Sequence, residues 1–193
     1  MVLPHGRAGG TWPLQALLPA AAAFLALYAL LAAPFLLQEG FEPELLLLST
    51  ILALFLAALS AIDLREYRLP DVLTLPLAAL GLIATPLVME ASPWWHAASA
   101  AIGFALMAGI ALAYAKLRGQ PGLGLGDAKL LAAAGAWLGA EALPSLLLWA
   151  CGSAIVGMLI RGWRTGVLAP HTRIPFGPFL AFATWMVWLY GPL

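Results

Sequence analysis

Long, uninterrupted apolar runs are the feature that most constrains this chain. A transmembrane helix needs about 20 apolar residues, because the hydrocarbon layer is about 30 Å thick and each residue rises about 1.5 Å. Such runs recur through a chain of 193 residues in which 63% are hydrophobic and 9% are charged. An average soluble domain is about 25% charged. The sequence therefore predicts an all-α, polytopic membrane protein and argues against a soluble globule.

Seven apolar runs are predicted to be membrane spans of a single membrane-embedded domain. The first is expected to be a retained helix, since it is longer than the roughly 7–15 apolar residues of a signal peptide. Trp185, Trp188 and Tyr190 near the end of the last run are expected to anchor it at the membrane interface. Within the domain, residues 1–193, the predicted spans are about 14–37, 45–62, 72–89, 97–115, 127–143, 145–160 and 176–193.

The positions of the charges predict an orientation. Seven spans give two alternating sets of connections, and all nine Lys and Arg residues fall in one set, while five of the six glutamates fall in the other. Lys and Arg accumulate in cytoplasmic loops, so we expect a cytoplasmic N-terminus and an external C-terminus. The formal net charge is zero, which gives no support for a nucleic-acid partner. The expected surroundings are a lipid bilayer.

All three aspartates fall on the predicted cytoplasmic side. Two spans separate Asp63 from Asp127, so an out-and-back hairpin returns the chain to the same membrane depth. Paired carboxylates in a partly dry site share a proton, so one can act as a general acid while the other activates a water molecule. Asp127 can instead cap the fifth helix with Gly126. Asp71, directly after Pro70, is expected to be a helix N-cap.

The helix ends suggest separate roles for the two aspartates. Asp127 lies near a predicted helix N-terminus, where the dipole favours a negative charge. We therefore expect a lowered pKa for Asp127, which would make Asp127 the initial base and Asp63 the acid.

Three segments resemble the type IV prepilin peptidases, which are membrane aspartic peptidases with a GxGD motif. Residues 124–139, GLGDAKLLAAAGAWLG, resemble the GxGD block of that family. Residues 63–71, DLREYRLPD, look like its first aspartate loop, and residues 174–179, IPFGPF, look like its C-terminal motif. The segments follow the family's order and cover the chain from about residue 45 to the end.

The resemblance implies a specific activity. These enzymes remove the short basic leader from type IV prepilins, or from the pseudopilins of type II secretion, at the cytoplasmic face of the bacterial inner membrane. It also implies that Asp63 and Asp127 are the catalytic residues. Larger members carry a cysteine-rich, zinc-binding loop after the first helix and methylate the new N-terminus. The loop at 38–44 has no cysteine, so we expect a short form with no metal or cofactor and without support for methyl transfer.

The sequence lacks the common motifs of metal-dependent and serine hydrolases. Cys151 is the only cysteine, and neither HExxH nor GxSxG occurs. His5, His96 and His171 are far apart in the sequence, so no metal site is expected.

Three residues around Asp127 are candidates for substrate binding or for shaping the loop. Gly124 and Gly126 allow the backbone to approach a bound peptide closely, or simply to enter the fifth helix through a tight turn. Lys129 can orient a carboxylate, bind lipid headgroups, or extend to the membrane surface without a further role.

A fourth candidate region is the segment Pro175, Phe176, Gly177 and Pro178. Its two prolines lack backbone donors, so the segment is not expected to be regular helix. Irregular backbone at membrane depth is tolerated where it is buried in protein or lines a wet cavity. We therefore expect it to form a substrate-docking edge near the aspartates.

Two other functional classes are compatible with the same residues. A small proton-coupled transporter could use Asp63 and Asp127 as a proton relay, but such a relay should continue across the bilayer. The predicted span interiors contain no other Asp, Glu, Lys, Arg or His beyond Lys129 and Glu141, near the ends of the fifth span. A non-catalytic scaffold for a pilus or secretion complex would bind the same partners without cleaving them.

Overall fold

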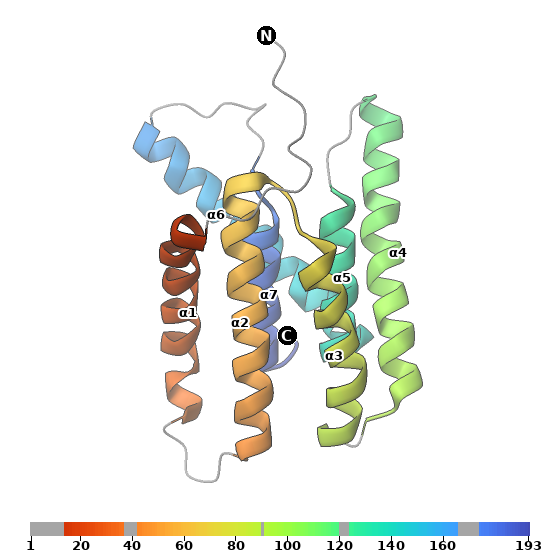
Figure 1. Cartoon of the computed structure of the whole chain (residues 1–193). Coiled ribbons are helices and arrows are strands. Elements are labelled where there is room, and N and C mark those ends of the chain that lie inside the picture. Colours follow the sequence, from red (N-terminus) through yellow and green to blue (C-terminus); the bar gives the residue numbers. More distant parts are fainter. Residues whose placement is uncertain (1–13, 37–41, 90, 120–123, 166–173) are drawn as a thin grey trace.

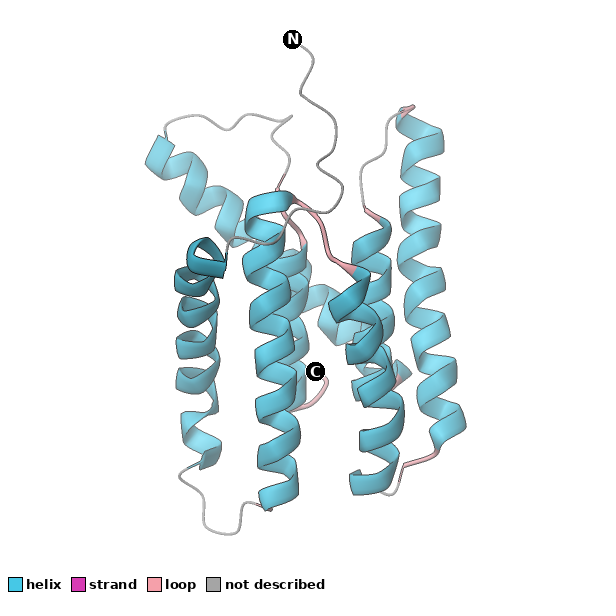
Figure 2. Cartoon of the chain, in the orientation of Figure 1, coloured by secondary structure: helices cyan, strands magenta, loops and turns pink. Residues whose placement is uncertain are grey.

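The chain folds as a bundle of helices (Figure 1). The computed structural model describes residues 14–36, 42–89, 91–119, 124–165 and 174–193. Within these ranges there are seven α-helices, one short 3-10 helix and no strand, which confirms the all-α prediction (Figure 2). The helices are α1 (Leu14–Leu36), α2 (Pro43–Glu66), α3 (Asp71–Met89), α4 (Pro93–Arg118), α5 (Leu125–Leu138), η1 (Ala140–Ala142), α6 (Leu143–Thr165) and α7 (Gly177–Tyr190).

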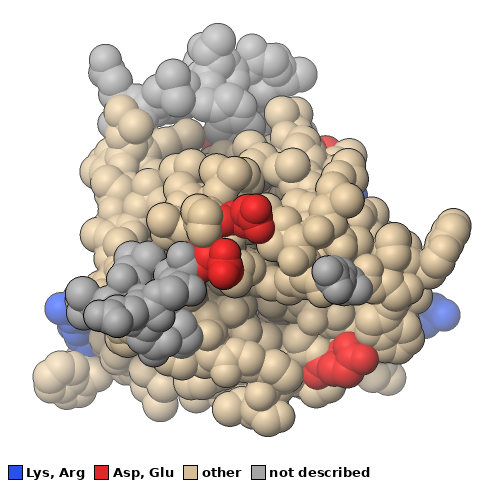
Figure 3. Space-filling model, turned by 90° about the horizontal axis from the view of Figure 1, so that it is seen from below, with Lys and Arg blue, Asp and Glu red and all other residues tan. Residues whose placement is uncertain are grey.

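Successive helices run in alternating directions (Figure 1). As a result, α2, α4 and α6 end at the same end of the bundle at which α3, α5 and α7 begin, and we call this the pocket end. The opposite face carries acidic side chains, and Lys and Arg are visible only at its edges (Figure 3). The described basic residues all belong to segments at the pocket end: Arg65, Arg68, Lys116, Arg118, Lys129, Arg161 and Arg164.

Five stretches are long and apolar enough to cross a membrane: α1, α2, α3, α4 and residues 140–164, which include η1 and most of α6. The helices α5 and α7 have 14 residues each. The predicted fifth span, 127–143, is therefore wrong at its end. Gly139 adopts φ +83°, which favours glycine, and it ends α5, while Leu143 belongs to α6.

The helix α5 packs closely against α3 and α4. A Cβ atom at Gly135 would lie 2.5 Å from the backbone oxygen of Ser99 in α4, so the two backbones approach each other more closely than any larger residue would allow. On the other side, the Trp137 Nε1–H donates to the backbone oxygen of Leu77 in α3 at 2.8 Å. These contacts fix α5, and with it the helix start that carries Asp127.

The helix α7 is held by aromatic side chains that point into the bundle. Trp185 is 2% exposed and donates to the Tyr28 backbone oxygen in α1 at 3.1 Å. Trp188 donates to the Ser49 hydroxyl in α2 at 2.8 Å. The expectation that Trp185 anchors the chain at the membrane interface is therefore wrong, because its indole is buried and its N–H has a partner in α1. For Trp188, which is partly buried, and for Tyr190, which is exposed, the interfacial role stays a prediction.

Candidate active site

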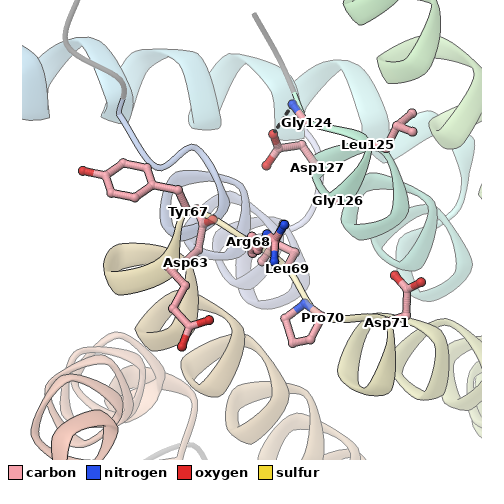
Figure 4. A pocket seen from close by; sticks show the side chains of 11 residues that line it. Asp63, Tyr67, Arg68, Leu69, Pro70, Asp71, Gly124, Leu125, Gly126 and Asp127 are labelled. Carbon is pink, nitrogen blue, oxygen red and sulfur yellow. Dashed lines mark hydrogen bonds between the residues drawn. The ribbon is translucent and has the colours of Figure 1, made fainter. Parts of the chain in front are cut away.

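A pocket of about 520 Å³ opens at the pocket end (Figure 4). It is lined by Asp63 near the end of α2, by residues 66–71 of the α2–α3 connection, and by residues 124–127 at the start of α5. Asp63 and Asp127, the two aspartates singled out in the sequence, thus line the same pocket although they belong to different helices. The sequence did not single out Tyr67 or Leu69, which also line it.

Asp63 is almost completely buried, with 5% of its surface exposed. Its Oδ2 atom accepts a hydrogen bond from the backbone N–H of Gly177 at 2.9 Å. Gly177 is the first residue of α7, so the carboxylate lies at the positive end of that helix dipole. This contact compensates for the unfavourable position of Asp63 near the C-terminus of α2, and it gives a buried carboxylate the hydrogen bond that it requires.

The contact with Asp63 requires a glycine at position 177. A Cβ atom there would lie 2.7 Å from Asp63 Oδ2. Pro175, Gly177 and Pro178 are buried, and none of the residues 175–178 is among those that line the pocket. The expectation that this segment is not helical is wrong for its last two residues, because α7 begins at Gly177. Pro178 fits in the first turn, where its missing N–H leaves no bond unmade.

Asp127 is the third residue of α5 and is partly buried. Its Oδ2 atom accepts the backbone N–H of Gly124 at 3.3 Å, and its own N–H donates to the Gly124 oxygen at 3.2 Å. The capping interpretation is thus confirmed, but with Gly124 rather than Gly126 at the helix N-cap. Gly126 faces the α2–α3 connection, where a Cβ atom would approach Leu69 Cβ to 3.0 Å.

The pKa of Asp127 differs from the expectation based on its helix end. Asp127 lies outside the five candidate spans, and burial raises the pKa of its carboxyl to about 6. The charge of Asp63 raises the pKa further, whereas the Gly124 N–H lowers it. The predicted lowering is wrong, because burial outweighs the contact with the helix N-terminus. A carboxyl with this pKa retains a proton for part of the time near neutral pH, as a general acid must.

Lys129 forms an ion pair beside the pocket. Its Nζ lies 2.6 Å from Asp71 Oδ1, and the two side chains are 33% and 55% exposed. Lys129 thus orients a carboxylate, one of the roles expected of it, although this carboxylate belongs to neither Asp63 nor Asp127. Asp71 is the first residue of α3. The pair connects the start of α3 to the start of α5, the two elements that carry the pocket-lining residues Asp71 and Asp127.

The connection between α2 and α3 begins with a strained residue. Tyr67 adopts φ 53°, ψ 39°, and it is the one non-glycine residue with positive φ in the described part of the chain. Its N–H donates to the Asp63 backbone oxygen at 2.9 Å and ends α2 one turn after that aspartate. A residue with a side chain in this conformation costs about 1–2 kcal/mol, and such strain clusters at functional sites.

The described ranges hold no group of three or more His, Cys, Asp or Glu residues that could bind a metal ion. His96 lies in the first turn of α4, at the end of that helix that is far from the pocket end, and its Nδ1 lies 2.8 Å from the Ala136 backbone oxygen. His5 and His171 lie outside the described residues. The expectation of no metal or cofactor stays a prediction.

Several proteins similar to this chain are named as prepilin leader peptidases. This chain is 42% identical over 145 residues to a prepilin leader peptidase/N-methyltransferase of Xanthomonas campestris pv. campestris, and the match covers 73% of this chain and 49% of the relative. Identity to the Aeromonas hydrophila protein of the same name is 41% over 148 residues, 75% of this chain and 50% of that protein. The Pseudomonas aeruginosa protein is 40% identical over 137 residues, 70% and 47% of the two chains.

The chain spans about half the length of these curated relatives. No solved structure matches it. The family model described as the type IV leader peptidase family matches residues 50–160, which is more than half of the chain and includes both Asp63 and Asp127. The chain therefore belongs to the type IV leader peptidase family.

Proposed function

We propose that this chain is a membrane aspartic endopeptidase that removes the basic leader from type IV prepilins or type II secretion pseudopilins. The observation that carries the proposal is the presence of Asp63 and Asp127 in one pocket of a leader peptidase family member. The relatives named prepilin leader peptidase support the substrate class. Residues 1–193 would form one membrane-embedded domain.

The two carboxyls would divide the work of general acid and general base. Asp63, held by the Gly177 N–H, is the initial base, and Asp127, whose pKa is about 6, carries the shared proton. Asp63 takes a proton from the water that attacks the scissile carbonyl, and Asp127 donates its proton to the carbonyl oxygen. The tetrahedral intermediate then breaks its C–N bond as the proton on Asp63 passes to the departing amine, and Asp127 takes back a proton from one of the two hydroxyls as the C=O bond re-forms. No acyl-enzyme forms, and the assignment reverses the one expected from the helix ends.

The pocket end would face the cytoplasm of a bacterial inner membrane. The support is the segregation of the described Lys and Arg residues to segments at this end, since cytoplasmic connections carry the excess of basic residues. The N-terminus would then be cytoplasmic and the C-terminus external. A leader on the cytoplasmic side could enter the pocket without crossing the bilayer.

The smaller motifs would serve the aspartates rather than react themselves. Gly177 positions Asp63, and Gly124 positions Asp127, each through a backbone N–H. Lys129 stabilises the end of the α2–α3 connection through its ion pair with Asp71. In this proposal the segment 175–178 is a support for Asp63 and not a docking edge for substrate.

We limit the proposed activity to leader cleavage. The relatives are named for N-methyl transfer as well, but the loop at 38–44 of the present sequence has no cysteine. Its single cysteine, Cys151, is an exposed residue of α6 and cannot by itself build a cysteine-rich zinc site.

The test is cleavage of a prepilin by the purified protein in detergent, followed by the mass of the substrate. A peptidase releases the leader, and Asp63→Asn, which keeps the shape of the side chain, slows the release by at least about 100-fold while the protein stays folded. A scaffold binds the prepilin but leaves its mass unchanged. A proton-coupled transporter leaves the mass unchanged and moves protons across vesicles. Release of the leader at equal rates by both proteins would refute the proposal.

A further inference from the structure

A second cavity lies next to the pocket, on the side where α1, α2 and α3 meet. This apolar groove has a volume of about 430 Å³. All nine residues that line it are apolar, and they include Leu18 of α1, Ala58 and Ile62 of α2, Pro70 of the connection, and Val72 of α3. The groove is thus built from three helices and extends along α2 toward the residue before Asp63.

The shape of the apolar groove suits a helix. Its α2 side presents the small, partly exposed side chain of Ala58, and small residues allow helix backbones to approach closely in membranes. Its two walls are exposed apolar side chains, Leu18 at 61% and Val72 at 81%. An apolar helix lying between these walls would cover both of them.

The apolar groove is continuous with the pocket. Pro70 lines both cavities, and Ile62 of the groove directly precedes Asp63 of the pocket. An occupant of the groove whose chain continues past Pro70 therefore enters the pocket that the two aspartates line.

The charge at the junction distinguishes between possible occupants. The pocket lining holds the carboxylates of Asp63 and Glu66 against one basic side chain, Arg68, while Asp127 carries the shared proton and Asp71 is paired with Lys129. An anionic lipid headgroup would be repelled there. A polypeptide with a basic segment joined to an apolar helix matches the pocket and the groove at once.

We propose that the apolar groove binds the apolar helix of the prepilin, with the leader passing over Pro70 into the pocket. This inference rests on the proposed function and adds the surface by which the enzyme recognises its substrate within the bilayer. Recognition of the helix would hold the scissile bond at a fixed distance from the aspartates, so cleavage would occur at one junction.

Photo-cross-linking tests the contact directly. A photoreactive residue is placed at Val72 in the Asp63→Asn/Asp127→Asn protein, in vesicles of phosphatidylethanolamine and phosphatidylglycerol, and uncleaved prepilin is added. The matched control has the same residue at Ala105, an exposed position of α4 that is remote from the groove. We expect a prepilin adduct from position 72 and none from position 105. Lipid adducts alone at position 72 would overturn the proposal.

Filling the groove tests its effect on turnover. Ala58→Phe places a ring on the α2 side of the groove, and Ala105→Phe makes the same change on α4. We expect Ala58→Phe to raise KM for prepilin about tenfold with little change in kcat, a loss of about 1.4 kcal/mol in binding. Ala105→Phe should leave both constants unchanged. An unchanged KM in folded Ala58→Phe protein would overturn the proposal.

The two proposals fail in different ways. If the wild-type protein cleaves prepilin but gives no adduct at position 72, the groove proposal is wrong and the proposed function stands. If an adduct forms at position 72 but the wild-type protein never cleaves, the groove binds the helix and the peptidase proposal is wrong.

Discussion

Replacing Gly177 by Ala perturbs the buried aspartate from outside the pocket, since Gly177 is not among the residues that line it. The added Cβ atom would lie 2.7 Å from Asp63 Oδ2, whereas ordinary van der Waals contacts begin at 3.4 Å, so the carboxylate must move by about 0.7 Å. That movement also stretches the 2.9 Å hydrogen bond from the Gly177 N–H. A hydrogen bond to a charged group is worth about 1.5–3 kcal/mol.

The expected consequence of Gly177→Ala is a fall in kcat of about 100-fold, equivalent to about 2.7 kcal/mol of transition-state stabilisation. The assay is single-turnover cleavage of a prepilin by purified protein, with the melting temperature and the elution volume recorded alongside. Gly109→Ala is the matched control, because a Cβ atom there meets nothing within 4 Å. It should cleave at the wild-type rate.

The reasoning is refuted by one clear result. If folded Gly177→Ala protein cleaves as fast as the wild type, the position of the Asp63 carboxylate does not limit the reaction. A loss of cleavage together with a large fall in melting temperature would instead assign Gly177 to the stability of α7, so both quantities are needed.

Three further predictions concern the pH profile and the stability of the bundle. The pKa of Asp127 is raised to about 6 and the proposed role of its carboxyl is to donate a proton, so kcat/KM should fall as the pH rises through about 6; a rise there would contradict the role. Gly135→Ala should lower the free energy of unfolding by about 1–3 kcal/mol, because its Cβ atom would lie 2.5 Å from a backbone oxygen of α4. The melting temperature should fall accordingly; an unchanged melting temperature would show that α4 and α5 can move apart at no cost. Tyr67→Gly should be about 1 kcal/mol more stable than Tyr67→Ala, since both lack the ring and only the alanine keeps the left-handed strain; equal melting temperatures would argue against that strain.

Much of the fold was predictable because membrane helices follow from length and apolarity alone. The starts of α1 and α3 and the end of α3 agree with the predicted boundaries to within one residue. The short helices were not predictable in the same way. Residues 127–143 have the composition of one span, yet the break at Gly139 depends on a positive φ that composition does not encode.

The two aspartates of the candidate site could be predicted from the sequence, but their hydrogen bonds and pKa values could not. Alternating spans return Asp63 and Asp127 to one end of the bundle, so their common pocket follows from topology. The hydrogen bond from Gly177 to Asp63 joins residues of α2 and α7, and no local pattern indicates it. The pKa of Asp127 could not be inferred from its helix end, because the larger effect is burial by segments remote in the sequence.

The indole side chains of α7 illustrate why surface and interior are hard to distinguish in such a chain. Tryptophans near the end of an apolar run are typical of a membrane interface. Here the hydrogen-bond partners of Trp185 and Trp188 lie inside the bundle, on α1 and α2. Tryptophan is thus used here for contacts between helices. Whether a tryptophan near a helix end lies at the membrane interface or inside the bundle depends on how the helices pack.

The most direct test of the account is the rate of leader release by three carboxylate-to-amide variants. Asp63→Asn and Asp127→Asn each remove one member of the proposed pair, and Glu44→Gln makes the equivalent change at the far end of α2, where the side chain is exposed. The account predicts that each aspartate variant is slower by about 100- to 10,000-fold while Glu44→Gln cleaves at the wild-type rate. Wild-type cleavage by either folded aspartate variant would contradict it.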